Sequence, residues 1–193
     1  KKNYAYARCE KVLVPSPFRI EPRCPIYKPC GGCQLQAVAY DKQLQIKQQK
    51  VFGNLQRIGG FAAEEIESVM EPIVGMDDPY RNKAQYPIGV DKDGNPVAGF
   101  YAGRTHSIIP GTDCCIGAET DGVILREILA FMKRYQISAY QEESGRGLVR
   151  HVLIRTGFTT GEIMVCLVIN GKKLPHEQEL ISSLTKLKLC ENM

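Results

Sequence analysis

A tight group of cysteines constrains this chain more than any other feature. Cys24, Cys30 and Cys33 lie close together in the segment CPIYKPCGGC. Three thiolates on one short loop can converge on a single inorganic centre, and Gly31 and Gly32 let the backbone bend around it and donate N–H groups to sulfur. The spacing is too tight for three independent disulfide bridges, which are typical of short secreted domains. We therefore predict reduced thiols that bind a metal centre.

The loop supplies three ligands, so a fourth must come from elsewhere. The other cysteines are Cys9, Cys114, Cys115, Cys166 and Cys190. Cys166 lies in an apolar run with strand character, where a cysteine usually acts as a small hydrophobe. A layout of three clustered cysteines plus a distant fourth favours a [4Fe–4S] cluster over zinc, because structural zinc sites usually show two paired knuckles. Zinc and ordinary thiols stay open as alternatives.

Helical and strand patterns alternate along the rest of the chain. Apolar residues recur at helical spacing in 36–58, 120–135 and 175–187. Strand-like runs occupy 85–90, 97–101, 107–110, 148–155 and 163–169. The turn-rich segments DKDGNP and GFTTGE join neighbouring strand runs as hairpins. We predict an α+β fold with a mainly antiparallel sheet, flanking helices and a cysteine loop that holds a cluster.

Several function classes find no support in the sequence. No glycine-rich nucleotide loop follows a strand, so residues 1–193 are expected to lack a complete cofactor-binding α/β unit. No apolar run approaches eighteen residues and no secretory signal is recognisable, so we expect a cytoplasmic chain without a membrane partner. The net charge of +4 permits a polyanionic partner.

Cations interleaved with aromatic residues favour RNA binding at two places. Arg81 and Lys83 lie beside Tyr80 and Tyr86, which suits phosphate contact together with base stacking. Arg104 and His106 follow a hairpin strand in YAGRTH and allow the same reading. The alternative in both places is a solvated strand edge.

The run LVRHVLIR carries charge within an apolar strand. Strict alternation places His151 and Arg155 on one face with Val149 and Leu153, and Arg150 on the other. We predict that Arg150 and Arg155 have a function, with Arg150 able to hydrogen-bond within the core and Arg155 facing RNA or a domain interface.

Five segments together resemble one enzyme family. RCPIYKPCGGCQLQ, AYDKQLQIKQQ, YRNKAQYPIG, GFYAGRTHSIIPGTDCC and GLVRHVLIRTG are similar to the iron–sulfur RNA uracil-5-methyltransferases, which modify 23S ribosomal RNA, or tRNA in cluster-free relatives. The family pattern H-x-I-x(5)-C is matched by His106, Ile108 and Cys114, so the resemblance implies Cys114 as the fourth ligand.

The resemblance also implies a domain layout. Residues 1–22 would be the tail of an OB-like TRAM barrel, and 23–36 with 59–170 the central iron–sulfur and RNA-binding domain. Helix 37–58 would pack on a methyltransferase domain that binds S-adenosylmethionine, and 171–193 would lead toward that domain. No catalytic residue is then expected in 1–193, which should be inactive alone, and Cys190 lacks the motif of the nucleophile. The alternatives are a cluster- or zinc-bearing RNA-binding module and a redox or radical iron–sulfur protein.

Overall fold

The computed structural model describes residues 4–76, 79–187 and 189. The chain forms two compact units. One contains the chain up to Pro22 together with Leu35–Gly75, and the other contains Arg23–Gln34 together with the chain from Met76 onward. No helix within the described residues is long and apolar enough to cross a membrane.

In its described residues, the first unit contains two helices and an irregular N-terminal segment. Helix α1 spans Tyr40–Arg57 and α2 spans Ala63–Val69. The proline-rich segment before α1 contains no helix, as its prolines predict. It is fastened to the start of α1 by an antiparallel bridge between Arg19 and Val38. Helix α2 was not predicted from the sequence. The Glu65 carboxylate accepts a hydrogen bond from the Ala62 N–H at 3.0 Å, which stabilises its first turn.

Helix α1 leaves much of its apolar stripe exposed. Val51 is 48% exposed, Leu55 38% and Ile58 83%. Leu44 is half-buried. The apolar face by which helix 37–58 is expected to pack on a methyltransferase domain is therefore partly uncovered at these residues.

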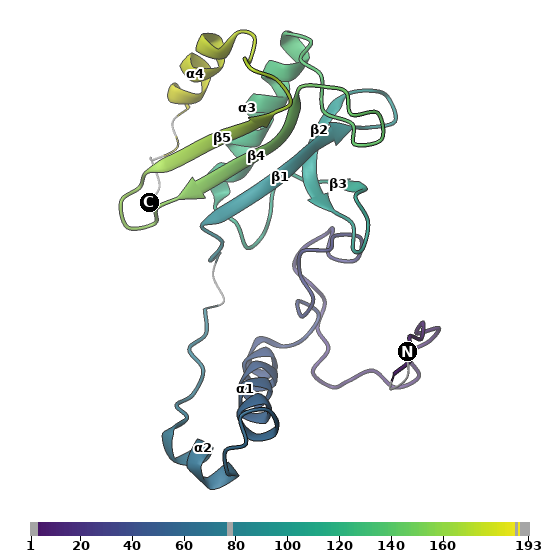
Figure 1. Ribbon diagram of the computed structural model, residues 1–193, viewed down its shortest axis with the longest axis vertical. Helices are drawn as coiled ribbons and strands as arrows, with labels where there is room; N and C mark the ends of the chain where they lie inside the picture. Colours follow the sequence, from purple (N-terminus) through teal and green to yellow (C-terminus); the bar gives the residue numbers. More distant parts are fainter. Residues whose placement is uncertain (1–3, 77–78, 188, 190–193) are drawn as a thin grey trace. The chain divides into compact units, whose positions relative to one another are not determined.

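The second unit is built on a five-stranded antiparallel sheet. Its strands are β1 (Lys83–Val90), β2 (Pro96–Tyr101), β3 (Ile108–Pro110), β4 (Val149–Thr156) and β5 (Ile163–Ile169). Their order across the sheet is β3-β2-β1-β4-β5. Helices α3 (Glu119–Arg134) and α4 (Glu177–Thr185) complete the unit. The predicted α+β class with an antiparallel sheet and flanking helices is confirmed (Figure 1).

The core lies between α3 and one face of the sheet. Its largest fully buried side chains are Tyr86, Ile124, Leu125, Ile128, Phe131, Met132, Val149, Val152 and Ile154. Leu180 of α4 joins the same cluster. Along β5, exposed Met164, Cys166 and Val168 alternate with residues that pack on the core, so the opposite face is open at this strand. Cys166 is therefore an exposed residue and not a core one.

A β-bulge in β4 changes which side chains face the core. Val149 pairs with Ile169 and His151 pairs with Val168, so Arg150 is an extra residue without a partner in the ladder. Val149 is fully buried, whereas Arg150 and His151 both line a pocket. The prediction that Val149 and His151 share a face was wrong, and Arg150, which was considered able to hydrogen-bond within the core, lines the pocket together with His151. Strict alternation fails here because a bulge adds one residue and re-aims those around it.

Candidate functional site

The cysteine loop is attached to the end of β2. Cys30 forms an antiparallel bridge with Ala102, and the Gly31 N–H donates to the Tyr101 carbonyl at 3.0 Å. A Cβ atom on Gly31 would lie 3.0 Å from the backbone of Gly103, so glycine is what allows this close approach. The loop is thereby held at a defined place on the sheet.

Contacts within the loop agree with the expectation that its glycines donate backbone N–H groups to sulfur. The Gly32 N–H donates to the Cys30 sulfur at 3.4 Å. The Tyr27 hydroxyl donates to the Gln34 carbonyl at 3.0 Å and closes the loop. The N–H donation to sulfur is the kind of contact that stabilises a thiolate.

Cys114 and Cys115 lie in the turn that leads into α3. The Gly117 N–H donates to the Cys114 carbonyl at 2.9 Å, and the Arg81 N–H donates to the Ile116 carbonyl at 2.8 Å. The Arg81 guanidinium lies 4.0 Å from the Cys114 sulfur and 5.1 Å from the centre of the Phe100 ring. Arg81, predicted to bind RNA, therefore faces this thiol.

The loop and the turn bring their thiols into one neighbourhood. Burial raises the pKa of Cys24, and the nearby thiols of Cys115 and Cys114 raise it further. Burial likewise raises the pKa of Cys33, with added contributions from Cys114, Cys115 and Cys30 and an opposing one from Arg81. The thiols of Cys24, Cys33, Cys114 and Cys115 are therefore close enough to influence one another's pKa, and the Cys30 thiol influences that of Cys33.

The cysteine sulfurs are the type of ligand atom that a thiolate-bound metal centre requires. Soft sulfur ligands of this number suit an iron–sulfur cluster or zinc, and a cation among them would favour the thiolate forms that burial disfavours. In the described part of the chain, however, no three Cys, His, Asp or Glu side chains are arranged around one ion position. The loop and the turn bring these thiols near one another, but the side chains do not adopt the geometry of metal ligands.

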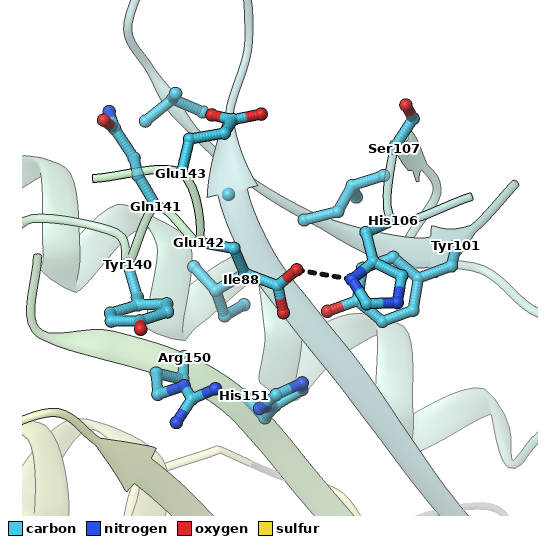
Figure 2. Close-up of a pocket in the computed structure, with 13 residues that line it drawn as sticks. Ile88, Tyr101, His106, Ser107, Tyr140, Gln141, Glu142, Glu143, Arg150 and His151 are labelled. Carbon is cyan, nitrogen blue, oxygen red and sulfur yellow. Dashed lines mark hydrogen bonds and ion pairs between the residues drawn. The ribbon is translucent and has the colours of Figure 1, made fainter. Parts of the chain in front are cut away.

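A pocket of about 320 Å³ opens beside β1 and β4 (Figure 2). The Arg150 guanidinium lies over the Tyr140 ring, 4.4 Å from its centre. The Tyr101 and His106 rings are stacked, with centres 5.2 Å apart and planes 27° apart. Figure 2 shows Glu142 between these two groups, with its carboxylate on the His106 Nδ1 atom.

The charges in the pocket act on one another. Burial raises the pKa of the Tyr101 hydroxyl, with a further increase from Glu142 and a decrease from Arg150. Burial lowers the pKa of His151, Arg150 lowers it further, and Glu142 opposes both. The neutral form of His151 is therefore favoured relative to a free imidazole.

The predicted RNA-binding residues fall in separate places on the second unit. His106 and Arg150 meet in the pocket. Lys83 and Arg155 lie opposite each other on β1 and β4, and both are exposed. Arg104 is exposed in the turn after β2, with a positive φ of 64°.

Three pocket residues were not found from the sequence. Tyr101, Tyr140 and Glu142 come from a strand end and a loop that are distant in sequence. Only the strand order, which brings β1 between β2 and β4, makes them neighbours. The tyrosines in GFYAGR and SAYQEE are the weak signal that was available.

Comparisons with known proteins give a consistent result. No model of a known protein family matches the chain. An uncharacterized RNA methyltransferase of Clostridium tetani is 44% identical over 187 residues, which is 96% of this chain and 39% of the relative. Another from Halalkalibacterium halodurans is 42% identical over 188 residues, 96% of this chain and 40% of that protein.

A solved structure agrees with these sequence matches. The tRNA (uracil-54, C5)-methyltransferase of Pyrococcus abyssi, in complex with S-adenosyl-L-homocysteine, superposes with a TM-score of 0.65 at 27% identity. The match covers 88% of this chain and 37% of that one. The chain is similar to part of an RNA methyltransferase. It spans about two fifths of the length of the curated relatives that it matches.

Proposed function

We propose that this chain is part of an S-adenosylmethionine-dependent RNA uracil-5-methyltransferase that acts on 23S rRNA in the cytoplasm. In this proposal, residues 1–193 hold a [4Fe–4S] cluster and contribute RNA binding. The similarity to RNA methyltransferases over nearly the whole chain supports the enzyme class. The proposal that the chain binds a cluster is supported mainly by the approach of the loop thiols to Cys114 and Cys115.

Cys24, Cys30, Cys33 and Cys114 are the proposed cluster ligands. A bound cluster would supply a compact charged cross-link between the loop at 23–34 and the turn before α3. Four protein thiolates leave no open iron position, which favours a structural role over radical chemistry. Arg81 would support this link, because its guanidinium faces the Cys114 sulfur and its backbone holds the same turn.

RNA binding is assigned to the cations of the second unit. Lys83 and Arg155 would contact phosphates from the exposed end of β1 and β4. Arg104 would extend this surface. His106 and Arg150 would bind RNA inside the pocket. Arg81 contributes to RNA binding in this proposal by positioning the turn that it contacts.

Methyl transfer is proposed to take place in a part of the enzyme outside these 193 residues. There, a thiolate adds to C6 of a flipped-out uracil, and C5 takes the methyl group from S-adenosylmethionine, which leaves as S-adenosylhomocysteine. A base then removes the C5 proton, and the C6–sulfur bond breaks to release the thiolate. The exposed stripe of Val51, Leu55 and Ile58 on α1 is the proposed contact surface for that domain.

A paired binding and activity assay tests this proposal. Purified 1–193 should bind a 23S rRNA fragment weakly, and more tightly than a tRNA, with an affinity that falls as salt rises. It should transfer no methyl group from labelled S-adenosylmethionine, whereas the full-length enzyme should label C5 of uridine in the same fragment. Methyl transfer by 1–193 alone, or a full-length enzyme that labels only tRNA, would contradict the proposal.

A further inference from the structure

The pocket beside β4 contains two planar stacks that are already assembled. On one side, Arg150 covers Tyr140 at 4.4 Å. On the other, Tyr101 stacks on His106 at 5.2 Å. Aromatic rings and guanidinium planes are the surfaces on which proteins stack unpaired bases. The bulge in β4 is what directs Arg150 into this pocket.

The floor and the volume of the pocket suit a small planar group. Ile88 is 3% exposed and, with Gly89, provides an apolar floor from β1. The volume of about 320 Å³ lies at the small end of ligand pockets. A single base fits this space better than a helical segment of RNA.

The polar groups of the pocket select the edge of such a base. Glu142, when ionised, only accepts hydrogen bonds, and its contact with His106 fixes its position. Within the described residues, the Arg150 side chain makes no hydrogen bond or ion pair, so its N–H groups can donate to a ligand. The pocket thus contains both a hydrogen-bond acceptor and a donor.

We propose that this pocket binds an unpaired guanine of the RNA. Guanine offers N1–H and N2–H donors, which match Glu142, and O6 and N7 acceptors, which match Arg150. Uracil places two carbonyl oxygens around its one N–H, so an oxygen would face the carboxylate. This inference rests on the proposed function, because it takes the ligand to be RNA.

Fluorescence anisotropy with short labelled oligonucleotides tests the guanine site. The probes are oligouridylate, the same strand with one central guanosine, and the same strand with one central adenosine. The unaltered chain should bind the guanosine strand about tenfold more tightly than either other strand, as expected for bidentate readout of one base.

Two variants and a matched control separate base readout from charge. In Glu142→Gln the guanosine preference should fall to near one, while oligouridylate binds as before or more tightly. Charge alone would instead tighten binding of all three strands by the same factor. Arg150→Lys should lower the preference and keep the salt dependence, because it keeps the charge and loses the planar fork. Glu162→Gln, at an exposed position in the β4–β5 turn, should keep the tenfold preference.

Each other outcome overturns the inference. Equal binding of the three strands, equal binding of the guanosine and adenosine strands, or a preference that survives Glu142→Gln would reject the guanine site and leave the proposed RNA function standing. A chain that binds none of the strands at low salt would reject both.

Discussion

Tyr86 donates a 2.9 Å hydrogen bond to the Asp121 carboxylate inside the core between β1 and α3. Tyr86 is fully buried and Asp121 is 3% exposed. Burial raises the pKa of Asp121, whereas the Tyr86 hydrogen bond and the Arg81 charge oppose that increase. Burial raises the pKa of Cys33 and the Arg81 charge opposes that increase too, so the same guanidinium acts on both the buried pair and the thiol site.

Removing the Tyr86 hydroxyl should destabilise the second unit. Tyr86→Phe leaves the Asp121 carboxylate buried without this donor, which should lower the free energy of unfolding by about 1–3 kcal/mol. Urea unfolding followed by circular dichroism measures the change. Tyr80→Phe is the matched control, because Tyr80 is 54% exposed and its change should stay within about 0.5 kcal/mol.

The raised pKa of Asp121 also predicts a pH dependence of stability. The folded chain holds the Asp121 proton more tightly than the unfolded chain does. Below the unfolded pKa of about 4, the group is protonated in both states and does not lower the free energy of unfolding. Its destabilising effect grows as pH rises toward the folded pKa and then levels off. The unfolding free energy of Asp121→Asn minus that of the unaltered chain should therefore increase with pH across this window. A constant difference from pH 4 to pH 8 would contradict the buried-charge account.

The pairing of Lys83 with Arg155 predicts opposite effects on stability and binding. These like charges lie directly opposite each other on β1 and β4, an arrangement that disfavours folding slightly and attracts a polyanion. Lys83→Gln should leave the free energy of unfolding equal or a few tenths of a kcal/mol higher. It should weaken RNA binding for all sequences and reduce the slope of log affinity against log salt by about one. Lys92→Gln, exposed in the β1–β2 turn, should leave that slope unchanged.

Most elements could be predicted because their patterns are local. The apolar run 163–169 became β5 with the same bounds, and the segment 120–135 became α3 at Glu119–Arg134. Helix α2 was missed because seven residues are too few for a helical period to show. Its local signal was the glutamate three residues after Ala62.

The parts of the site that depend on topology could not be predicted in the same way. The cysteine loop could be recognised because its three thiols are close in sequence. The pocket could not, because Tyr101 and Tyr140 become neighbours only through the strand order. Arg150 and His151 were predicted on opposite faces although both line the pocket, because a bulge breaks the period on which the prediction depended.

Iron and sulfide analysis of anaerobically purified chain tests the central claim most directly. We predict a brown protein with about four irons and four sulfides per chain. Cys33→Ser and Cys114→Ser should lose the cluster, while Cys166→Ser, on the open face of β5, should keep it. One tightly bound zinc without sulfide would contradict the cluster. A cluster kept by Cys114→Ser and lost by Cys115→Ser would contradict the assignment of its fourth ligand.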